Sequence, residues 1–101
     1  MIRHIVMWKL DTSYEEDEKL KLLKEIQVQL MALKSKIEEL KSINVYANSK
    51  KAPQANYDVM LDTTFDSFKD LDKYQKHPDH VEVGKFLKTL KINRSAIDFE
   101  I

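Results

Sequence analysis

Two periodicities of apolar residues alternate along this chain, and their order constrains the possible fold more than any other feature. Segments in which every second residue is apolar are typical of strands with one buried face, and they cover residues 2–10, 42–48, 57–65 and 92–101. Segments with apolar residues at steps of three and four are typical of amphipathic helices, and they cover residues 14–41, 67–77 and 79–90. The order β-α-β-β-α-α-β predicts an α+β fold of the ferredoxin-like, split βαβ type, in which helices cover one face of a four-stranded antiparallel sheet.

The helix boundaries carry local signals of their own. Ser13 and Glu16 fit a capping box at the start of the first helix. A helix of roughly 27 residues would span about 40 Å, whereas the strand at 2–10 spans about 30 Å. We therefore expect a break between Lys34 and Glu39. Pro78 restricts the residue before it to non-helical backbone, which predicts a corner between the two short helices.

Composition indicates a single domain over residues 1–101. Apolar residues make up 43% and charged residues 34%, which is the balance of a globular chain rather than a disordered one. Seventeen basic residues match seventeen acidic ones, which argues against a general binder of nucleic acid or of anionic membranes. Cysteine is absent and Gly84 is the only glycine, which excludes thiolate chemistry and glycine-rich phosphate loops. We find no signal peptide or membrane span, so the expected location is the cytoplasm.

The first strand is apolar on both faces, which helices on one side of a sheet would not bury. Val6 and Trp8 lie on one face of this strand, and Ile5 and Met7 lie on the other. Monomers rarely expose a large apolar patch. We therefore expect a homodimer in which the two sheets close over each other, with a chamber between them.

The segment Tyr74–His80, with the sequence YQKHPDH, contains two of the three histidines of the chain. Histidine beside a phenol can support acid–base chemistry, because its pKa lies close to neutrality. This segment resembles the most characteristic motif of the stress-responsive dimeric α/β-barrel (Dabb) family. Two further parts of the chain resemble the same family: the opening strand Ile2–Leu10, and Tyr57–Leu61 followed by Phe65–Ser67. The resemblance covers the whole chain, and it implies a ferredoxin-like fold that forms a homodimeric α/β barrel.

The resemblance also implies roles for individual residues. A plant polyketide cyclase of that family works without a cofactor and uses the tyrosine and the second histidine of the motif as an acid–base pair. By resemblance, Tyr74 is the acid or orienting group, His80 is the base, and His4 faces the same chamber. Val59 stands where the cyclase has a further pocket histidine, so the cyclase's own reaction is not expected here.

The predicted site has His80 and Tyr74 as catalytic residues and His4, Val6, Trp8 and Val59 as ligand contacts. Structural alternatives exist: His80 could cap its helix, and Trp8 could belong to the core or to the dimer interface. His77 is expected to satisfy the end of the preceding helix, whose dipole favours a cation. Because no cysteine or glutamate stands at a recognisable ligand spacing from the histidines, neither a metal nor another cofactor is predicted.

Three functions stay open at this point. The chain could be a stress-associated homodimer whose chamber binds a small apolar molecule without chemistry. It could instead be a cofactor-independent enzyme, polyketide cyclase-like or lyase-like, that acts on a carbonyl compound through the Tyr/His pair. A monooxygenase-like role is a third possibility, with only the fold behind it. The sequence does not decide whether the chain is an enzyme.

Overall fold

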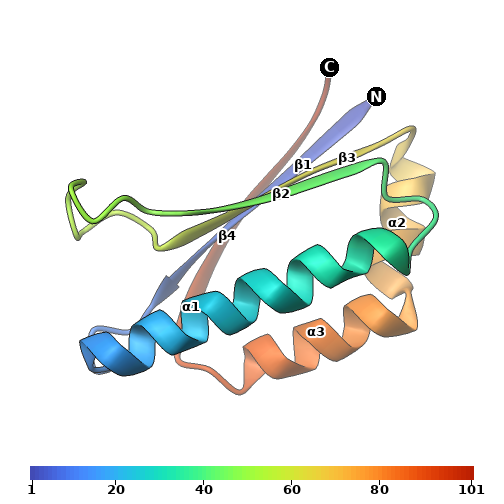
Figure 1. The fold of residues 1–101 in the computed structure, drawn as a ribbon. Coiled ribbons are helices and arrows are strands. Elements are labelled where there is room, and N and C mark those ends of the chain that lie inside the picture. The colour runs from blue at the N-terminus through green and yellow to red at the C-terminus, as the bar shows by residue number, and fades with distance from the viewer.

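The computed structural model describes residues 1–101, which form one four-stranded antiparallel sheet and three helices (Figure 1). The strands are β1 (Ile2–Leu10), β2 (Ser42–Ala47), β3 (Val59–Phe65) and β4 (Ile92–Glu100). The helices are α1 (Glu16–Met31), α2 (Phe68–Lys76) and α3 (Pro78–Lys88). The strand order β2-β3-β1-β4 confirms the ferredoxin-like arrangement predicted from the periodicities. None of the helices combines the length and the apolarity that a crossing of the bilayer requires.

All three helices lie on one side of the sheet, and the core fills the space between the two layers (Figure 1). Along β1 the buried residues alternate with less buried ones, so that His4, Val6 and Trp8 face the helices. Ile26 and Leu30 of α1 pack against this face. His4, Val6 and Trp8 were expected to face a chamber between two sheets. In the structure they lie on the face of the sheet that the helices cover.

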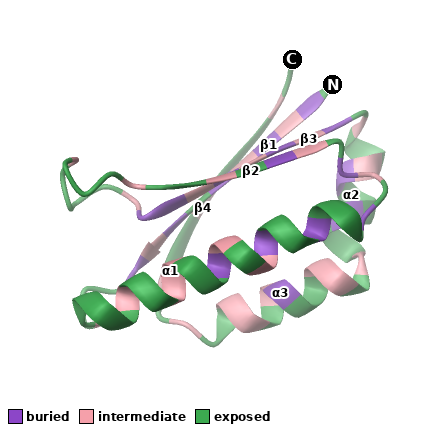
Figure 2. Cartoon of the chain, in the orientation of Figure 1, coloured by how far each residue is buried: buried purple, intermediate pink, exposed green.

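The opposite face of the sheet has no helix over it (Figure 2). Met7 on β1, Tyr46 on β2 and Ile97 on β4 share this face and are 37%, 52% and 60% exposed. The Arg3 guanidinium forms two hydrogen bonds of 2.9 and 2.6 Å with the Asp62 carboxylate there. The uncovered face thus combines apolar side chains with polar ones, which include this ion pair and the hydrogen-bonded hydroxyls of Ser42 and Thr64.

The first helix starts and ends differently from the sequence prediction. Its N-cap is Glu15, whose side chain makes no capping bond, so the predicted Ser13–Glu16 capping box is wrong. Ser13 instead donates its backbone N–H to the Asp11 carboxylate at 3.3 Å, within a turn. Regular helix ends at Met31 and a 3₁₀ turn follows over Ala32–Ser35, so the break occurs slightly before the expected region.

A sharp corner at His77 and Pro78 joins α2 to α3. The backbone of His77 is extended, as expected for a residue before proline, and Pro78 occupies the first turn of α3. The His77 Nδ1 accepts a hydrogen bond of 3.1 Å from the backbone N–H of Asp79. His77 does satisfy the end of α2, as predicted, through its backbone N–H, which donates to the Tyr74 carbonyl at 3.2 Å. Its side chain instead caps the start of α3, so the expected interaction of the imidazole with the dipole of the preceding helix is wrong.

Candidate functional site: a pocket between the sheet and α3

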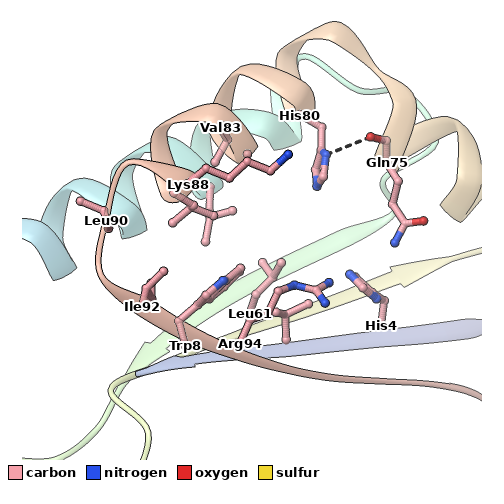
Figure 3. Close-up of a pocket in the computed structure, with 14 residues that line it drawn as sticks. His4, Trp8, Leu61, Gln75, His80, Val83, Lys88, Leu90, Ile92 and Arg94 are labelled. Carbon is pink, nitrogen blue, oxygen red and sulfur yellow. Dashed lines mark hydrogen bonds between the residues drawn. The ribbon is translucent and has the colours of Figure 1, made fainter. Parts of the chain in front are cut away.

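A pocket of about 400 Å³ opens between the helix-covered face of the sheet and α3 (Figure 3). Apolar side chains from β1, α1, β3, α3 and the start of β4 form most of its wall. The residues that line it are His4, Val6, Trp8, Leu30, Leu61, Gln75, His80, Val83, Gly84, Leu87, Lys88, Leu90, Ile92 and Arg94.

The position of this pocket corrects the expected site of the chamber. We predicted a chamber between two sheets, which a single chain could not enclose. The pocket lies instead within one chain, because His4, Val6 and Trp8 point toward the helices. A ligand site on this chain therefore does not require a partner subunit for its main walls.

His80 enters the pocket from the first turn of α3. Its Nδ1 lies 3.1 Å from the carbonyl oxygen of Gln75, at the end of α2. Because a carbonyl only accepts, Nδ1 must carry the hydrogen, and Nε2 keeps its lone pair. Figure 3 shows the ring extending from α3 toward the sheet. Burial lowers the pKa of His80, and the nearby positive charge of Arg94 adds to this effect against the opposing Gln75 bond.

Tyr74 lies directly behind His80 but does not line the pocket. The two rings are 4.5 Å apart at their centroids, and Phe65 packs on Tyr74 at 4.9 Å. The Tyr74 side chain is fully buried, its hydroxyl has no hydrogen-bond partner, and burial raises its pKa far above the ordinary range. The structure brings Tyr74 and His80 together as a pair of contacting rings tilted by 57° to each other, and of the two only His80 lines the pocket.

His4 sits on the sheet beneath the same pair. Its ring is 6.5 Å from the Tyr74 ring, in an edge-on orientation. The His4 Nδ1 is hydrogen bonded to the Asp98 carboxylate on the neighbouring strand β4. Since a carboxylate accepts, this contact places the hydrogen of His4 on Nδ1, and the side chain lines the pocket.

Val59 is the one predicted ligand contact that lies outside this pocket. It is buried in the core beside Trp8, its partner in the β1–β3 register. Val59 also borders a separate hollow, together with Met7, Tyr46 and Met60 of the open face of the sheet. Val59 therefore supports the pocket only indirectly, through the packing around Trp8.

Sequence reasoning missed the contribution of α3 and β4 to the pocket. Lys88 and Arg94 both line it, and Figure 3 shows the Arg94 side chain lying over the sheet between Trp8 and His4. The alternation of β4 contains a signal, because Arg94 has the same parity as Ile92 and Ala96. The pairing of Trp8 with Arg94 that places this cation in the pocket follows only from the strand register.

No group of three or more His, Cys, Asp or Glu side chains in the structure is arranged to hold a metal ion. Of the three histidines, two are held by hydrogen bonds to neighbouring residues and the third has a ring nitrogen available to a ligand. His77 caps a helix, His4 is tied to Asp98, and His80 faces the pocket. The chemistry that this arrangement offers is that of one neutral histidine beside an apolar cavity.

The fold and its pocket define the chain as a ferredoxin-like α+β domain with a pocket between the sheet and the helices. Residues 2–101 match the family described as the Stress responsive A/B Barrel Domain, Dabb. The chain belongs to this family, as the motif around His80 predicted. Comparison with curated proteins gives no match.

Solved structures of similar proteins share this fold. A dimeric protein of unknown function with a ferredoxin-like fold from Bacteroides fragilis is 31% identical at a TM-score of 0.90, with 99% of this chain and 95% of that chain covered. A dimeric ferredoxin-like protein of unknown function from Thermobifida fusca is 26% identical at a TM-score of 0.82, with 99% and 90% covered. A hydroxynitrile lyase from Passiflora edulis is 17% identical at a TM-score of 0.79, with 99% and 92% covered. At that identity, the last likeness shows the fold alone.

Proposed function

We propose that this chain is a homodimeric ligand-binding protein that holds a small, largely apolar molecule in the pocket between the sheet and α3. The observation that carries the proposal is the open volume of about 400 Å³ within one chain. Small-molecule sites are typically concave spaces of about 300–1,000 Å³ with apolar walls and a few polar groups. The wall of this pocket has that composition, with eight hydrophobic residues among fourteen.

The only glycine of the chain supports the same proposal. Gly84 lies in the middle of α3 and lines the pocket, although glycine costs about 1 kcal/mol relative to alanine at such a position. A Cβ at position 84 would meet no heavy atom within 4 Å, so no neighbour requires a glycine there. What the missing side chain does provide is room beside His80.

Filling that room tests the proposal. Trp8 is the only tryptophan and lines the pocket, so its fluorescence reports on an occupant. Wild type titrated with 2-octanone should give a saturable change, Gly84→Ala should keep it, and Gly84→Leu should lose it because the leucine occupies the cavity. A wild-type protein without a saturable response, or a folded Gly84→Leu variant that binds as wild type does, would contradict the proposal.

The homodimer is supported by the uncovered face of the sheet. Met7, Tyr46 and Ile97 leave an apolar surface there that a second sheet would bury. The Bacteroides fragilis relative, which has this fold at 31% identity, is described as dimeric. We therefore propose that two chains meet through these faces, each with its own pocket on the far side of its sheet.

A second candidate function is cofactor-independent chemistry of the cyclase or lyase kind, with His80 as the base. The observation in its favour is the tautomer set by Gln75, which leaves Nε2 of a neutral His80 free. Nε2 would take a proton from the carbon next to a ligand carbonyl and leave an enolate. The enolate carbon would add to a second carbonyl, and the proton on Nε2 would pass to the resulting alkoxide. A monooxygenase-like role has no residue in the pocket to support it and rests on the fold alone.

Tyr74 would act in this reaction as a positioning residue. Its hydroxyl is buried and does not reach the pocket, whereas its ring holds the His80 ring at 4.5 Å between centroids. Tyr74→Phe keeps that ring contact and should retain both the rate and its pH profile. Tyr74→Leu should lower the rate and shift the pH profile, because the surroundings of His80 change.

Deuterium exchange separates the enzyme from the binding protein. 2-Octanone in D₂O should gain deuterium next to its carbonyl faster with wild type than in buffer, and His80→Gln should return the rate to the buffer value. His77→Asn is the matched control, because it changes a histidine outside the pocket and retains a helix cap. Equal rates for wild type and His80→Gln would rule out the base and leave the binding function.

A further inference from the structure

The polar part of the pocket carries positive charge without any opposing carboxylate. Lys88 and Arg94 line it together with two histidines, and none of the lining residues is aspartate or glutamate. The chain as a whole has seventeen basic and seventeen acidic residues. The excess of cations at the pocket is therefore a local feature rather than a consequence of composition.

Lys88 and Arg94 also lack partners of their own. Neither takes part in any of the ion pairs of the structure. Five of the seventeen basic residues form ion pairs, and the other arginine of the chain, Arg3, is one of them, with Asp62 at 2.6 Å. The one acidic side chain on the inner side of β4 near the pocket, Asp98, is already bonded to His4.

Unpaired cations beside an apolar cavity favour a ligand of opposite charge. Lys88 and Arg94 are exposed to solvent at the edge of the pocket, so a neutral ligand can enter without stripping them of water, whereas an anionic head group would gain hydrogen bonds and ion pairs with them. A guanidinium presents several N–H groups in a plane, and this geometry matches the paired oxygens of a carboxylate or a phosphate. The apolar wall, formed in part by Trp8, Leu61 and Val83, suits the remainder of such a ligand.

We propose that the pocket binds an amphipathic organic anion, with a carboxylate or phosphate head group against Arg94 and Lys88 and an apolar body among the side chains of β1, β3 and α3. This inference rests on the proposed function, because it specifies the ligand of the same pocket. It adds a charge requirement, which a purely apolar binding site would not have.

A series of ligands with one tail and different head groups tests the charge requirement. Octanoate, octyl phosphate, octan-1-ol and octylamine are titrated against wild type, with Trp8 fluorescence as the readout of occupancy. At least one anion should bind about tenfold or more tightly than octan-1-ol, because hydrogen bonds to charged groups are stronger than neutral ones. Octylamine should bind most weakly, and the tighter of the two anions identifies the head group.

Variants then locate the source of the preference. Arg94→Gln should remove most of the advantage of the anion while octan-1-ol binds as before, and Arg94→Lys should restore part of it. Lys88→Gln should have a smaller effect of the same sign. Lys85→Gln is the matched control, because Lys85 lies on α3, is paired with Glu82 at 3.0 Å and does not line the pocket.

The outcomes separate this inference from the function on which it rests. Equal affinities for octanoate, octyl phosphate and octan-1-ol would overturn the charge requirement and leave an apolar ligand site. An anion preference that survives in both Arg94→Gln and Lys88→Gln would overturn the assignment of these residues. A wild-type protein that binds none of the four compounds would overturn the inference and the binding function together.

Discussion

At the scale of single residues, burial shifts the pKa values of Tyr74 and His80 in opposite directions and favours the neutral form of both side chains. It raises the pKa of the phenol and lowers the pKa of the imidazole, because a low-dielectric surrounding favours the neutral form of each group. The two differ in how their polar atoms are satisfied. His80 donates to the Gln75 carbonyl, whereas the Tyr74 hydroxyl has no partner. Only Tyr74 therefore carries an uncompensated cost of polar burial.

Removing that hydroxyl should stabilise the protein. A buried hydroxyl without a partner costs roughly 1–3 kcal/mol, so Tyr74→Phe is expected to raise the free energy of unfolding by about 1 kcal/mol. Urea unfolding of wild type and variant at pH 7 measures the difference. A clear loss of stability instead would show that the hydroxyl has a partner in solution, such as a bound water.

The lowered pKa of His80 predicts a pH dependence of stability. An unfolded histidine titrates near its ordinary pKa of about 6.5. In the folded chain His80 binds its proton less readily than in the unfolded chain. Its titration therefore leaves the free energy of unfolding unchanged at pH values well above about 6.5 and lowers it as the pH falls from there toward the folded pKa. The stability of wild type relative to His80→Gln should therefore decrease between pH 7.5 and pH 5.5. A difference that is constant or grows on acidification would contradict the lowered pKa.

At the scale of elements, the corner between α2 and α3 determines where His80 points. Pro78 prevents α2 from continuing, and the extended backbone of His77 turns the chain into α3. The His77 side chain then caps α3, while His80, on the first turn, reaches back to the last turn of α2 through Gln75. Hydrogen bonds of both histidines therefore stabilise the corner, and of the two only His80 faces the pocket.

Loss of the His77 cap should weaken α3. His77→Ala leaves the Asp79 N–H without its acceptor and is expected to lower the free energy of unfolding by about 1 kcal/mol. His77→Asn supplies another good capping acceptor and should recover most of the loss. Thermal unfolding of the three proteins at pH 7 provides the comparison, and equal midpoints for alanine and asparagine would show that the cap contributes nothing.

At the scale of the whole molecule, one sheet serves two surfaces. Its inner face carries the core and the pocket under α3, and its outer face carries exposed apolar side chains with no helix over them (Figure 2). The pocket and the proposed dimer surface therefore lie on opposite sides of the same strands. This separation allows assembly and ligand binding to be disturbed independently.

A charge on the outer face should break the dimer without emptying the pocket. Ile97→Lys places an ammonium where a second sheet would pack, and sedimentation velocity should show half the mass of wild type. The monomeric variant should still bind 2-octanone, because the pocket lies within one chain. Val28→Lys on α1 is the control, since Val28 is similarly exposed but lies away from the sheet. A wild-type monomer would contradict the homodimer outright.

Much of this architecture could be predicted because its causes are local. Strand β1 shows its period of two over Ile2–Leu10, and Pro78 marks the helix corner at the position where it occurs. The motif residue His80 was identified by its residue type and its neighbours in sequence. The prediction of the first helix start was wrong because two local signals compete there. Ser13 and Glu16 fit a capping box, but the backbone N–H of Ser13 donates to the Asp11 carboxylate in a turn instead.

The sequence by itself determined the order of the elements, the two faces of each strand and the family, because periodicity and motifs are properties of neighbouring residues. It did not determine which face of the sheet the helices cover, and so the ligand space was expected between two chains. Only the tertiary structure decided this, since Leu30 and Val83 close over Val6 and Trp8. The register between β1 and β4 places Asp98 beside His4 and Arg94 beside Trp8 at the pocket. His4 and Asp98 are 94 residues apart in the sequence, and no local pattern predicts a pairing over that separation, because it depends on how the whole sheet packs.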